Sequence, residues 1–430
     1  MAFAFTVMAD PVSSVAYAIE AALDHLDGDL ASLWPTMALV VATIAVVAAT
    51  YHQLIDRYPG GGESAEGLAS AFGEGWAFLP VGALLVDFTL TIAVSCAASA
   101  SALIAYAPGL ADARTAIAVA LAVIVAAGTS LGHRGRVMFA TATLAFVTVA
   151  FAVIGRGAGA DSAPGADPLV ASAGLGAVLL AMPLGMALAT GVEAPANAVA
   201  QLPQLDDRAR RRFGQLTLWI MVAIVALLTL SLAALAVLLD VGRPPADSTL
   251  IAEVARRVTG GDATFAVFQA VSALLLLAAA ASSYLAGSGL LEALAAHGGD
   301  EGALLPRAFT RRNRFLIPQW GLAALLGVAA AMIALAGGRE QEIVQFYAVA
   351  VFASFLGATI ASARLSHSDG KRVAFALNVL GAVLVAFVLA LNLTRLDGVI
   401  ALGGAGLVSG YLWSAWVRRG RPSGVASIVR

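Results

Sequence analysis

The sequence is poor in charge. Asp, Glu, Lys and Arg make up only 12% of its 430 residues, against about 25% in soluble proteins, while 60% of the residues are hydrophobic. A soluble enzyme of this length needs a charged surface, so the composition excludes that class. The net charge of −2, from 25 basic and 27 acidic residues, offers no basic excess, and nucleic acid is therefore not an expected partner.

Cysteine and histidine are also scarce. The single cysteine, Cys96, lies in an apolar run, so neither an intrachain disulfide nor a cysteine metal site can form. All five histidines fall at or beyond the ends of the apolar runs, which argues against haem or a buried histidine metal site. We find no motif for a nucleophile or a cofactor. The sequence therefore predicts neither an enzyme nor a bound cofactor.

Long apolar runs recur from one end of the chain to the other. A helix of about 20 apolar residues crosses the ~30 Å hydrocarbon core of a bilayer. The sequence therefore predicts an all-α, polytopic membrane protein with twelve membrane helices, lipid around it and no soluble domain. The runs are 2–26, 33–52, 75–106, 114–131, 136–155, 168–202, 215–239, 264–287, 315–337, 342–363, 372–393 and 398–417.

The positions of the basic residues predict the orientation, because Lys and Arg accumulate on the cytoplasmic side of a membrane. With the N-terminus inside, 18 of the 25 basic residues are cytoplasmic and 7 are outside. We therefore expect a multi-pass protein of the cytoplasmic membrane with both termini cytoplasmic. The outer set is Arg114, Arg156, Arg243, Arg256, Arg257, Arg339 and Arg395, and the inner set includes Arg57, Arg307, Arg312, Arg364, Lys371, Arg418 and Arg419.

Two runs are interrupted near their middles. The first contains Asp-Pro-Val-Ser-Ser at 10–14, and the sixth contains Thr-Gly-Val-Glu-Ala-Pro at 190–195. Proline and glycine favour unwinding, which is tolerated in a membrane only where protein or water satisfies the backbone. Interruptions five helices apart predict an inverted-repeat transporter with its substrate between them, and ordinary proline kinks are the alternative. The residues expected to break the helices are Pro11, Ser13, Ser14 and Gly191.

Four carboxylic acids lie well inside the runs, namely Asp10, Glu20, Asp87 and Glu193, with no Lys or Arg at comparable depth. A charge at the bilayer centre costs at least ~2.5 kcal/mol, so these acids must be protonated, solvated or matched by a bound cation. The imbalance predicts a site for cations, protons or both. The alternative is that these acids are protonated and form hydrogen bonds within the helix bundle. This alternative is strongest for Glu20, which lies near the outer end of its helix.

Oxygen-bearing side chains accompany these acids. Asp87, Thr91 and Ser95 are spaced i, i+4 and i+8, which places three oxygen groups on one helix face. Tyr17 and Tyr347 add phenol oxygens, although tyrosines near span ends also serve as interfacial anchors. Hard cations prefer such ligands.

The chain resembles the amino acid–polyamine–organocation superfamily and, within it, the KUP- and KimA-like potassium–proton symporters. The resemblance implies a LeuT-type fold of two inverted five-helix repeats, at 1–155 and 168–363, with discontinuous helices 1 and 6 and two further helices at 372–417. The stretches that carry it are Asp10-Pro-Val-Ser-Ser-Val-Ala-Tyr17-Ala-Ile-Glu20, Leu85-Val-Asp87-Phe-Thr-Leu-Thr91-Ile-Ala-Val-Ser95, Thr190-Gly-Val-Glu193-Ala, Leu305-Pro-Arg307 and Phe346-Tyr347-Ala-Val-Ala-Val-Phe352.

The resemblance also implies residue roles. Asp87 and Glu193, with Glu20, are assigned to proton coupling. Potassium carriers of this kind usually have a long cytoplasmic C-terminal region, and the short stretch after the last run departs from that pattern and puts nucleotide-type regulation in doubt. The residues implied to line the cation site are Asp10, Tyr17, Thr91, Ser95, Thr190 and Tyr347.

The expected function is a proton-coupled symporter that moves potassium by alternating access. An amino-acid or amine permease of the same superfamily is the main alternative. Amino-acid carriers hold the substrate carboxylate on free N–H groups in a break of helix one. Here Asp10 repels a carboxylate and Pro11 has no N–H, which favours a cation. A channel or a membrane-embedded enzyme has little support, and the assembly is left open, with a homodimer among the options.

Overall fold

The computed structural model describes residues 2–132, 136–160, 174–199, 202, 204–297 and 303–429. Within these ranges the regular structure is helical, apart from one isolated β-bridge between Arg312 and Pro318. Ten helical segments of the described chain are long and apolar enough to cross a membrane. The all-α membrane architecture predicted from the sequence is therefore confirmed, while the count of twelve helices stays a prediction.

Nine of these ten segments contain one long α-helix each. The tenth consists of α9 (Leu175–Gly185), the 3₁₀ turn η4 (Met186–Ala189) and α10 (Ala194–Ala198). The nine are α4 (Leu30–Arg57), α6 (Phe78–Tyr106), α7 (Arg114–Ser130), α8 (Arg136–Gly157), α11 (Asp207–Leu238), α13 (Ala263–Ala296), α16 (Glu340–Ser368), α17 (Arg372–Asn392) and α18 (Leu396–Arg418).

The shorter elements complete the described bundle. The first predicted span is divided into α1 (Ala2–Val7), α2 (Ala9–Ser13) and α3 (Val15–His25), and α15 (Gln319–Leu335) is an apolar helix of 17 residues. The connecting helices are α5 (Glu63–Phe72), η1 (Glu74–Ala77), η2 (Pro108–Ala113), α12 (Leu250–Thr259), η6 (Arg307–Thr310) and η7 (Val425–Val429).

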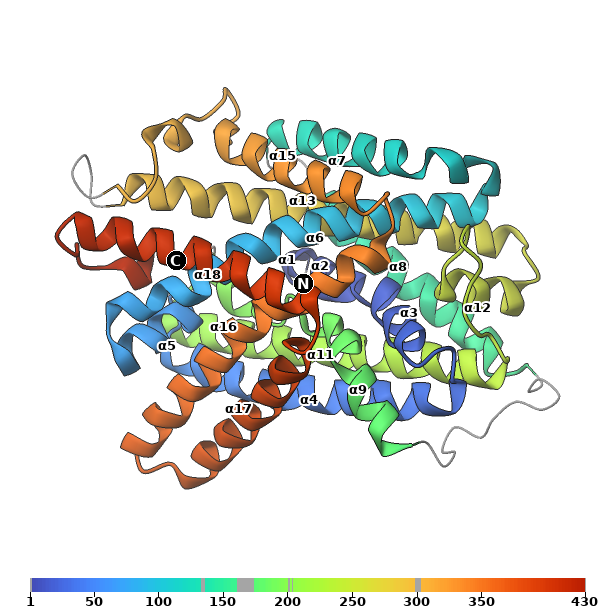
Figure 1. The fold of residues 1–430 in the computed structure, drawn as a ribbon, viewed down its shortest axis with the longest axis horizontal. Helices are drawn as coiled ribbons and strands as arrows, with labels where there is room; N and C mark the ends of the chain where they lie inside the picture. The colour runs from blue at the N-terminus through green and yellow to red at the C-terminus, as the bar shows by residue number, and fades with distance from the viewer. Residues whose placement is uncertain are drawn as a thin grey trace.

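Most of the long helices, α4, α6, α11, α13 and α18 among them, run roughly along the longest axis of the molecule, whereas α16 and α17 lie obliquely to it (Figure 1). The short helices α1 and α2 lie in the middle of the bundle. The helices α6 and α13 pack closely along each other, and α2 contacts α8, α11 and α13. Small residues permit the close approach, because a Cβ on Gly287 of α13 would lie 2.8 Å from Leu325 and 3.2 Å from Phe88. The short N-terminal helices are therefore enclosed by long ones.

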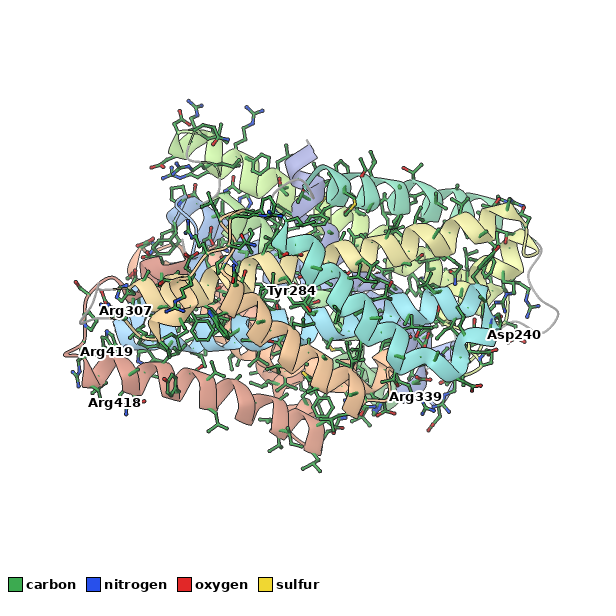
Figure 2. All side chains as sticks on the ribbon, turned by 90° about the horizontal axis from the view of Figure 1, so that it is seen from above. Asp240, Tyr284, Arg307, Arg339, Arg418 and Arg419 are labelled. Atoms are coloured by element: carbon green, nitrogen blue, oxygen red, sulfur yellow. The ribbon has the colours of Figure 1, made fainter. Side chains whose placement is uncertain are left out.

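The two ends of the bundle carry different parts of the predicted basic sets. Figure 2 shows Arg307, Arg418 and Arg419 at one end, and Asp240 and Arg339 at the other. We call these the Arg307 end and the Arg339 end. Basic residues expected on opposite sides of the membrane thus lie at opposite ends of the molecule.

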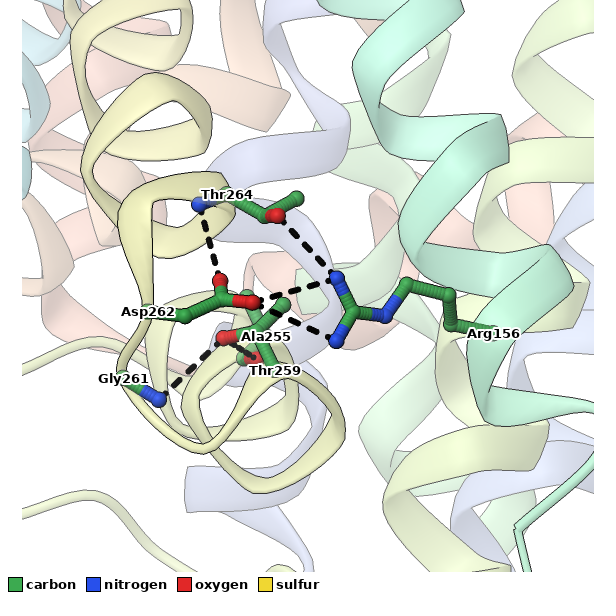
Figure 3. Close-up of polar contacts among 6 residues, drawn as sticks. All are labelled: Arg156, Ala255, Thr259, Gly261, Asp262 and Thr264. Atoms are coloured by element: carbon green, nitrogen blue, oxygen red, sulfur yellow. Dashed lines mark hydrogen bonds and ion pairs between the residues drawn. The ribbon is translucent and has the colours of Figure 1, made fainter.

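A polar cluster joins α8 to α13 at the Arg339 end (Figure 3). Arg156 of α8 contacts Asp262 at 3.3 Å and donates a hydrogen bond to the Thr264 hydroxyl at 3.0 Å. Asp262 also accepts the Thr264 backbone N–H at 2.8 Å and so caps α13. Both charged side chains are nearly half exposed, so the pair adds little stability and mainly positions the two helix ends.

Candidate functional site

The interruption of the first span bends the helix without unwinding it. Met8 and Ser14, which separate the three short helices, both keep right-handed helical dihedral angles. The Ser14 N–H bonds to the carbonyl of Asp10 at 3.3 Å. Pro11 and Ser13 therefore lie inside α2 and not in unwound backbone as expected, because Pro11 occupies the first turns of α2, where a missing N–H is tolerated.

The interruption of the sixth span does unwind. Thr190 is extended, with φ −61° and ψ 142°, and Gly191 is left-handed, with φ +75°. Left-handed backbone is open to glycine at no steric cost, which explains why the chain leaves the helix here. It resumes at α10 with Pro195 in the first turn, where proline is favoured.

The two interruptions contact each other directly. The hydroxyls of Ser14 and Thr190 are hydrogen-bonded at 2.9 Å, and the Tyr17 hydroxyl donates to Ser14 at 3.2 Å. A Cβ on Gly191 would lie 2.7 Å from Cδ of Pro11 and 3.1 Å from Oδ2 of Asp10. Segments about 180 residues apart in the sequence thus form one polar contact at the centre of the bundle.

Asp10 is the acidic residue at this contact. Its side chain is only 9% exposed, and in the described part of the chain its Oδ1 atom has no hydrogen-bond partner. The carboxyl groups of Asp87 and Glu193 lie near enough for the three charges to act on one another. Among the described residues no group of three His, Cys, Asp or Glu side chains is arranged to hold a metal ion, so the acids lie near one another without forming such a cluster.

The predicted polar face of the third span is buried. Asp87, Thr91 and Ser95 all lie on α6 with little or no exposure. Oδ1 of Asp87 and Oγ of Ser95 lack a hydrogen-bond partner within the described ranges. The side chain of Tyr347, predicted to join these residues, lies outside the described part of the structure.

Glu20 lies apart from the other acids. It follows Asp10 by ten residues, about 15 Å along a helix. Its carboxylate accepts the Leu250 N–H at the start of α12 at 2.7 Å, and the charges that act on it are those of Glu340 and Asp24. The structure therefore places Glu20 with the connecting helix α12 and not with the central acids.

The structure adds polar residues that sequence reasoning did not single out. Tyr51 of α4 donates to Oε2 of Glu193 at 3.0 Å and is hydrogen-bonded to Ser64 at 2.9 Å. Glu63, beside Ser64 at the start of α5, is 1% exposed. Nothing in the local sequence marks these residues, because Tyr51 is near the end of its apolar run and Glu63 follows a glycine-rich turn.

A cavity of about 320 Å³ extends from Asp10 along α13. Its lining follows α13 from Ser282 to Glu292, about 15 Å of helix. Glu292 pairs with Arg312 at 2.5 Å, close to η6 and thus at the Arg307 end. The remaining polar lining is contributed by Thr6, Asn197, Ser283 and Ser288.

The opposite side of the bundle is closed by a buried polar cluster. Glu340 of α16 accepts the Ser101 hydroxyl at 2.6 Å and lies 3.8 Å from the Arg114 guanidinium. Arg114 also donates to the carbonyl of Ala246. Residues of α6, α7 and α16 are thereby held together at this end. Of the three central acids, Asp10 lines the cavity, whose lining reaches Glu292 near the Arg307 end.

The sequence is similar to those of known transport proteins. The potassium transporter KimA of Bacillus subtilis (strain 168) is 29% identical over 360 residues, which cover 80% of this chain and 58% of KimA. The chain thus matches less than three fifths of that relative's length. A profile of the amino acid permease family matches residues 2–401, nearly the whole sequence. The chain belongs to the amino acid permease family.

Proposed function

We propose that this permease is a secondary active symporter that carries potassium together with protons across the cytoplasmic membrane. One observation carries the proposal: the carboxylate of Asp10 is buried, keeps an unpartnered oxygen in the described structure, and lies where two interrupted spans meet. A bound cation offsets the cost of a carboxylate at this depth.

The ligands around Asp10 suit a hard cation. The Ser14 and Thr190 hydroxyls are hydrogen-bonded to each other, and unwound backbone follows Thr190. Carbonyl oxygens of unwound backbone coordinate cations in carriers built from inverted repeats. We assign potassium, the cargo, to a set of oxygen ligands made up of Asp10, Tyr17, Thr91, Ser95, Thr190 and Tyr347.

Protons neutralise the remaining acids. Asp87 and Glu193 share the neighbourhood of Asp10, and three negative charges so close together disfavour one another. Protonation of Asp87 and Glu193 reduces this repulsion and lets the loaded site be dehydrated. Since Glu20 bonds to α12 at 2.7 Å, we keep it out of the coupling set.

Alternating access follows from the cavity and the cluster that seals the other side. We place the Arg307 end in the cytoplasm, with both termini. We infer a LeuT-type fold with twelve helices in a state that is accessible from the inside. Opening at the other side then requires the contact between Glu340, Ser101 and Arg114 to break. Each positive charge moved inward gains about 2.3 kcal/mol per 100 mV of membrane potential.

Uptake into proteoliposomes tests the proposal. We expect rubidium, a potassium congener, to enter protein-containing vesicles under an inward proton gradient and to enter much more slowly once an ionophore collapses that gradient. Vesicles without protein provide the background. Rubidium entry that stays at this background contradicts the proposal.

An amino-acid substrate is the second candidate, favoured by the family profile over residues 2–401. The same vesicles then accumulate labelled amino acids and exclude rubidium. Asp10 opposes this candidate, because its carboxylate repels that of an amino acid at the position where such carriers bind it.

A further inference from the structure

A chain of buried hydroxyls leads away from Glu193. The Tyr51 phenol, which has no exposed surface, bonds to Oε2 of Glu193 at 3.0 Å and to Oγ of Ser64 at 2.9 Å. A carboxylic acid is thus connected to two hydroxyls, each of which accepts one proton while donating another.

A second buried acid lies next to the end of this chain of hydroxyls. Glu63 precedes Ser64 at the first turn of α5, and its carboxyl group is close enough for its charge to act on Tyr51. The helix α5 packs against α16 and against η7, which follows α18 (Figure 1). This region belongs to the Arg307 end, the side that we place in the cytoplasm.

We propose that Tyr51 and Ser64 form a proton-transfer path that carries the coupling proton from Glu193 to Glu63 and releases it at the Arg307 end. This inference rests on the proposed proton-coupled symport. With this path, the proton leaves separately from the cation. Without it, both would leave through the cavity beside Asp10.

The transfer balances at each atom. The O–H bond of protonated Glu193 breaks as its proton forms a bond to the Tyr51 oxygen, whose own proton moves to Ser64. The proton of Ser64 then passes to the Glu63 carboxylate and from there to water. Glu193 ends as a carboxylate, both hydroxyls keep one proton each, and their rotation restores the starting hydrogen bonds.

The charged surroundings of α5 are compatible with this release. Glu66 lies one turn after Glu63 on the same helix. Arg364 of α16 lies over the Phe72 ring at 4.9 Å, Glu74 of η1 accepts the Gly424 N–H, and Arg57 of α4 pairs with Asp369. Tyr51 is hydrogen-bonded to Glu193, and the charge of Glu63 acts on it, so the proposed path begins and ends on a carboxylic acid.

The Tyr51 hydroxyl can be removed without disturbing the cation contact. Its ring packs edge-on against Phe355 at 5.7 Å, a contact that phenylalanine preserves. The Ser14 and Thr190 contact uses other side chains. Tyr284→Phe is the matched control, because the Tyr284 hydroxyl is also buried and bonds only weakly, at 3.3 Å, to the carbonyl of Ala122.

Two assays on the full chain in proteoliposomes separate the steps. Rubidium–rubidium exchange at equal pH requires the loaded carrier to reorient but releases no proton. The second assay follows rubidium uptake driven by a proton gradient together with the luminal pH. This uptake requires the carrier to release a proton in every transport cycle. We expect Tyr51→Phe and Ser64→Ala to slow driven uptake and proton entry about tenfold to a hundredfold, as loss of a positioned proton-transfer group does, with exchange near wild type.

Each outcome is informative. If Tyr51→Phe keeps driven uptake and proton entry at the wild-type rate, the path is overturned. The path is also overturned if both variants lose exchange and driven uptake equally, because such a loss indicates a structural or cation-binding role. Should Tyr51→Phe fail to fold, Ser64→Ala decides the question alone. A wild-type protein that exchanges no rubidium overturns the potassium proposal itself, and with it the path.

Discussion

The two interrupted spans respond differently to helix-breaking residues. The segment around Pro11 keeps a helical backbone and bends only at Met8 and Ser14, whereas Gly191 takes a left-handed conformation and ends its helix. The difference shows that proline near the start of a short helix is tolerated, while glycine at a positive φ permits the chain to leave the helix. The first span therefore supplies side chains to the site, and the sixth supplies a hydroxyl and unwound backbone.

Replacing Gly191 with alanine should have the largest effect. The new Cβ would lie 2.7 Å from Pro11, and a left-handed residue other than glycine costs about 1–2 kcal/mol before that clash is counted. We expect rubidium uptake to be lost and the melting temperature of the purified protein to fall. Gly403→Ala is the control, because a Cβ there meets no atom within 4 Å, and equal behaviour of the two variants would contradict the close contact.

Asp10→Asn should come next, because it removes the charge but preserves the shape of the side chain. We expect rubidium uptake at the background level and an unchanged melting temperature. Asp24→Asn is the matched control, since Asp24 pairs with Arg243 at 3.4 Å in a partly exposed position away from the site. Wild-type uptake by Asp10→Asn would remove Asp10 from the cation site.

Glu193→Gln should alter the response to pH and leave cation binding in place. The amide cannot take up or release the coupling proton, although it preserves a hydrogen bond to Tyr51. We expect slower uptake whose rate no longer rises when the external pH is lowered. A pH profile that matches the wild type would exclude Glu193 from coupling.

Ser14→Ala is expected to have a smaller effect. It removes the 2.9 Å bond to Thr190, and hydrogen bonds between membrane helices contribute about 0.6 kcal/mol on average. We predict weaker rubidium affinity by a few fold and a slightly lower melting temperature. Ser414→Ala is the control, because it removes a partly exposed hydroxyl that bonds within its own helix at 2.8 Å. An equal loss of affinity in this control would contradict a role for the contact between Ser14 and Thr190.

Pro11→Ala should have the smallest effect. Because α2 is already helical, alanine fits the same backbone, and such exchanges change stability by only about 0.4–1 kcal/mol. Uptake and melting temperature should both stay near wild type. A large loss would show that the first span unwinds at Pro11 in another state of the transport cycle.

Much of the architecture follows from the sequence. Apolar length predicts the helices, and the acids Asp10, Asp87 and Glu193 are recognisable because charge is so rare in the runs. Gly191 is likewise predictable as a break, since glycine weakens a helix and takes a positive φ at no steric cost.

Other features depend on packing and were not predictable. The sequence around Pro11 is equally compatible with a kink and with unwinding, and only its position within α2 decides between them. The position of Glu20 inside an apolar run does not reveal its bond to Leu250, because that partner lies 230 residues away on α12. Tyr51 and Glu63 lie near span ends, where a tyrosine or an acid is usually exposed, and their burial comes from helices far apart in the sequence.

The central claim is that both interrupted spans bind one cation. Equilibrium binding of radioactive rubidium to the purified protein, with Asp10→Asn and Thr190→Val compared to wild type, tests it most directly. We predict saturable binding to the wild type and its loss or severe weakening in both variants, one from each span. Binding that either variant retains at wild-type affinity would contradict a site shared between the two spans.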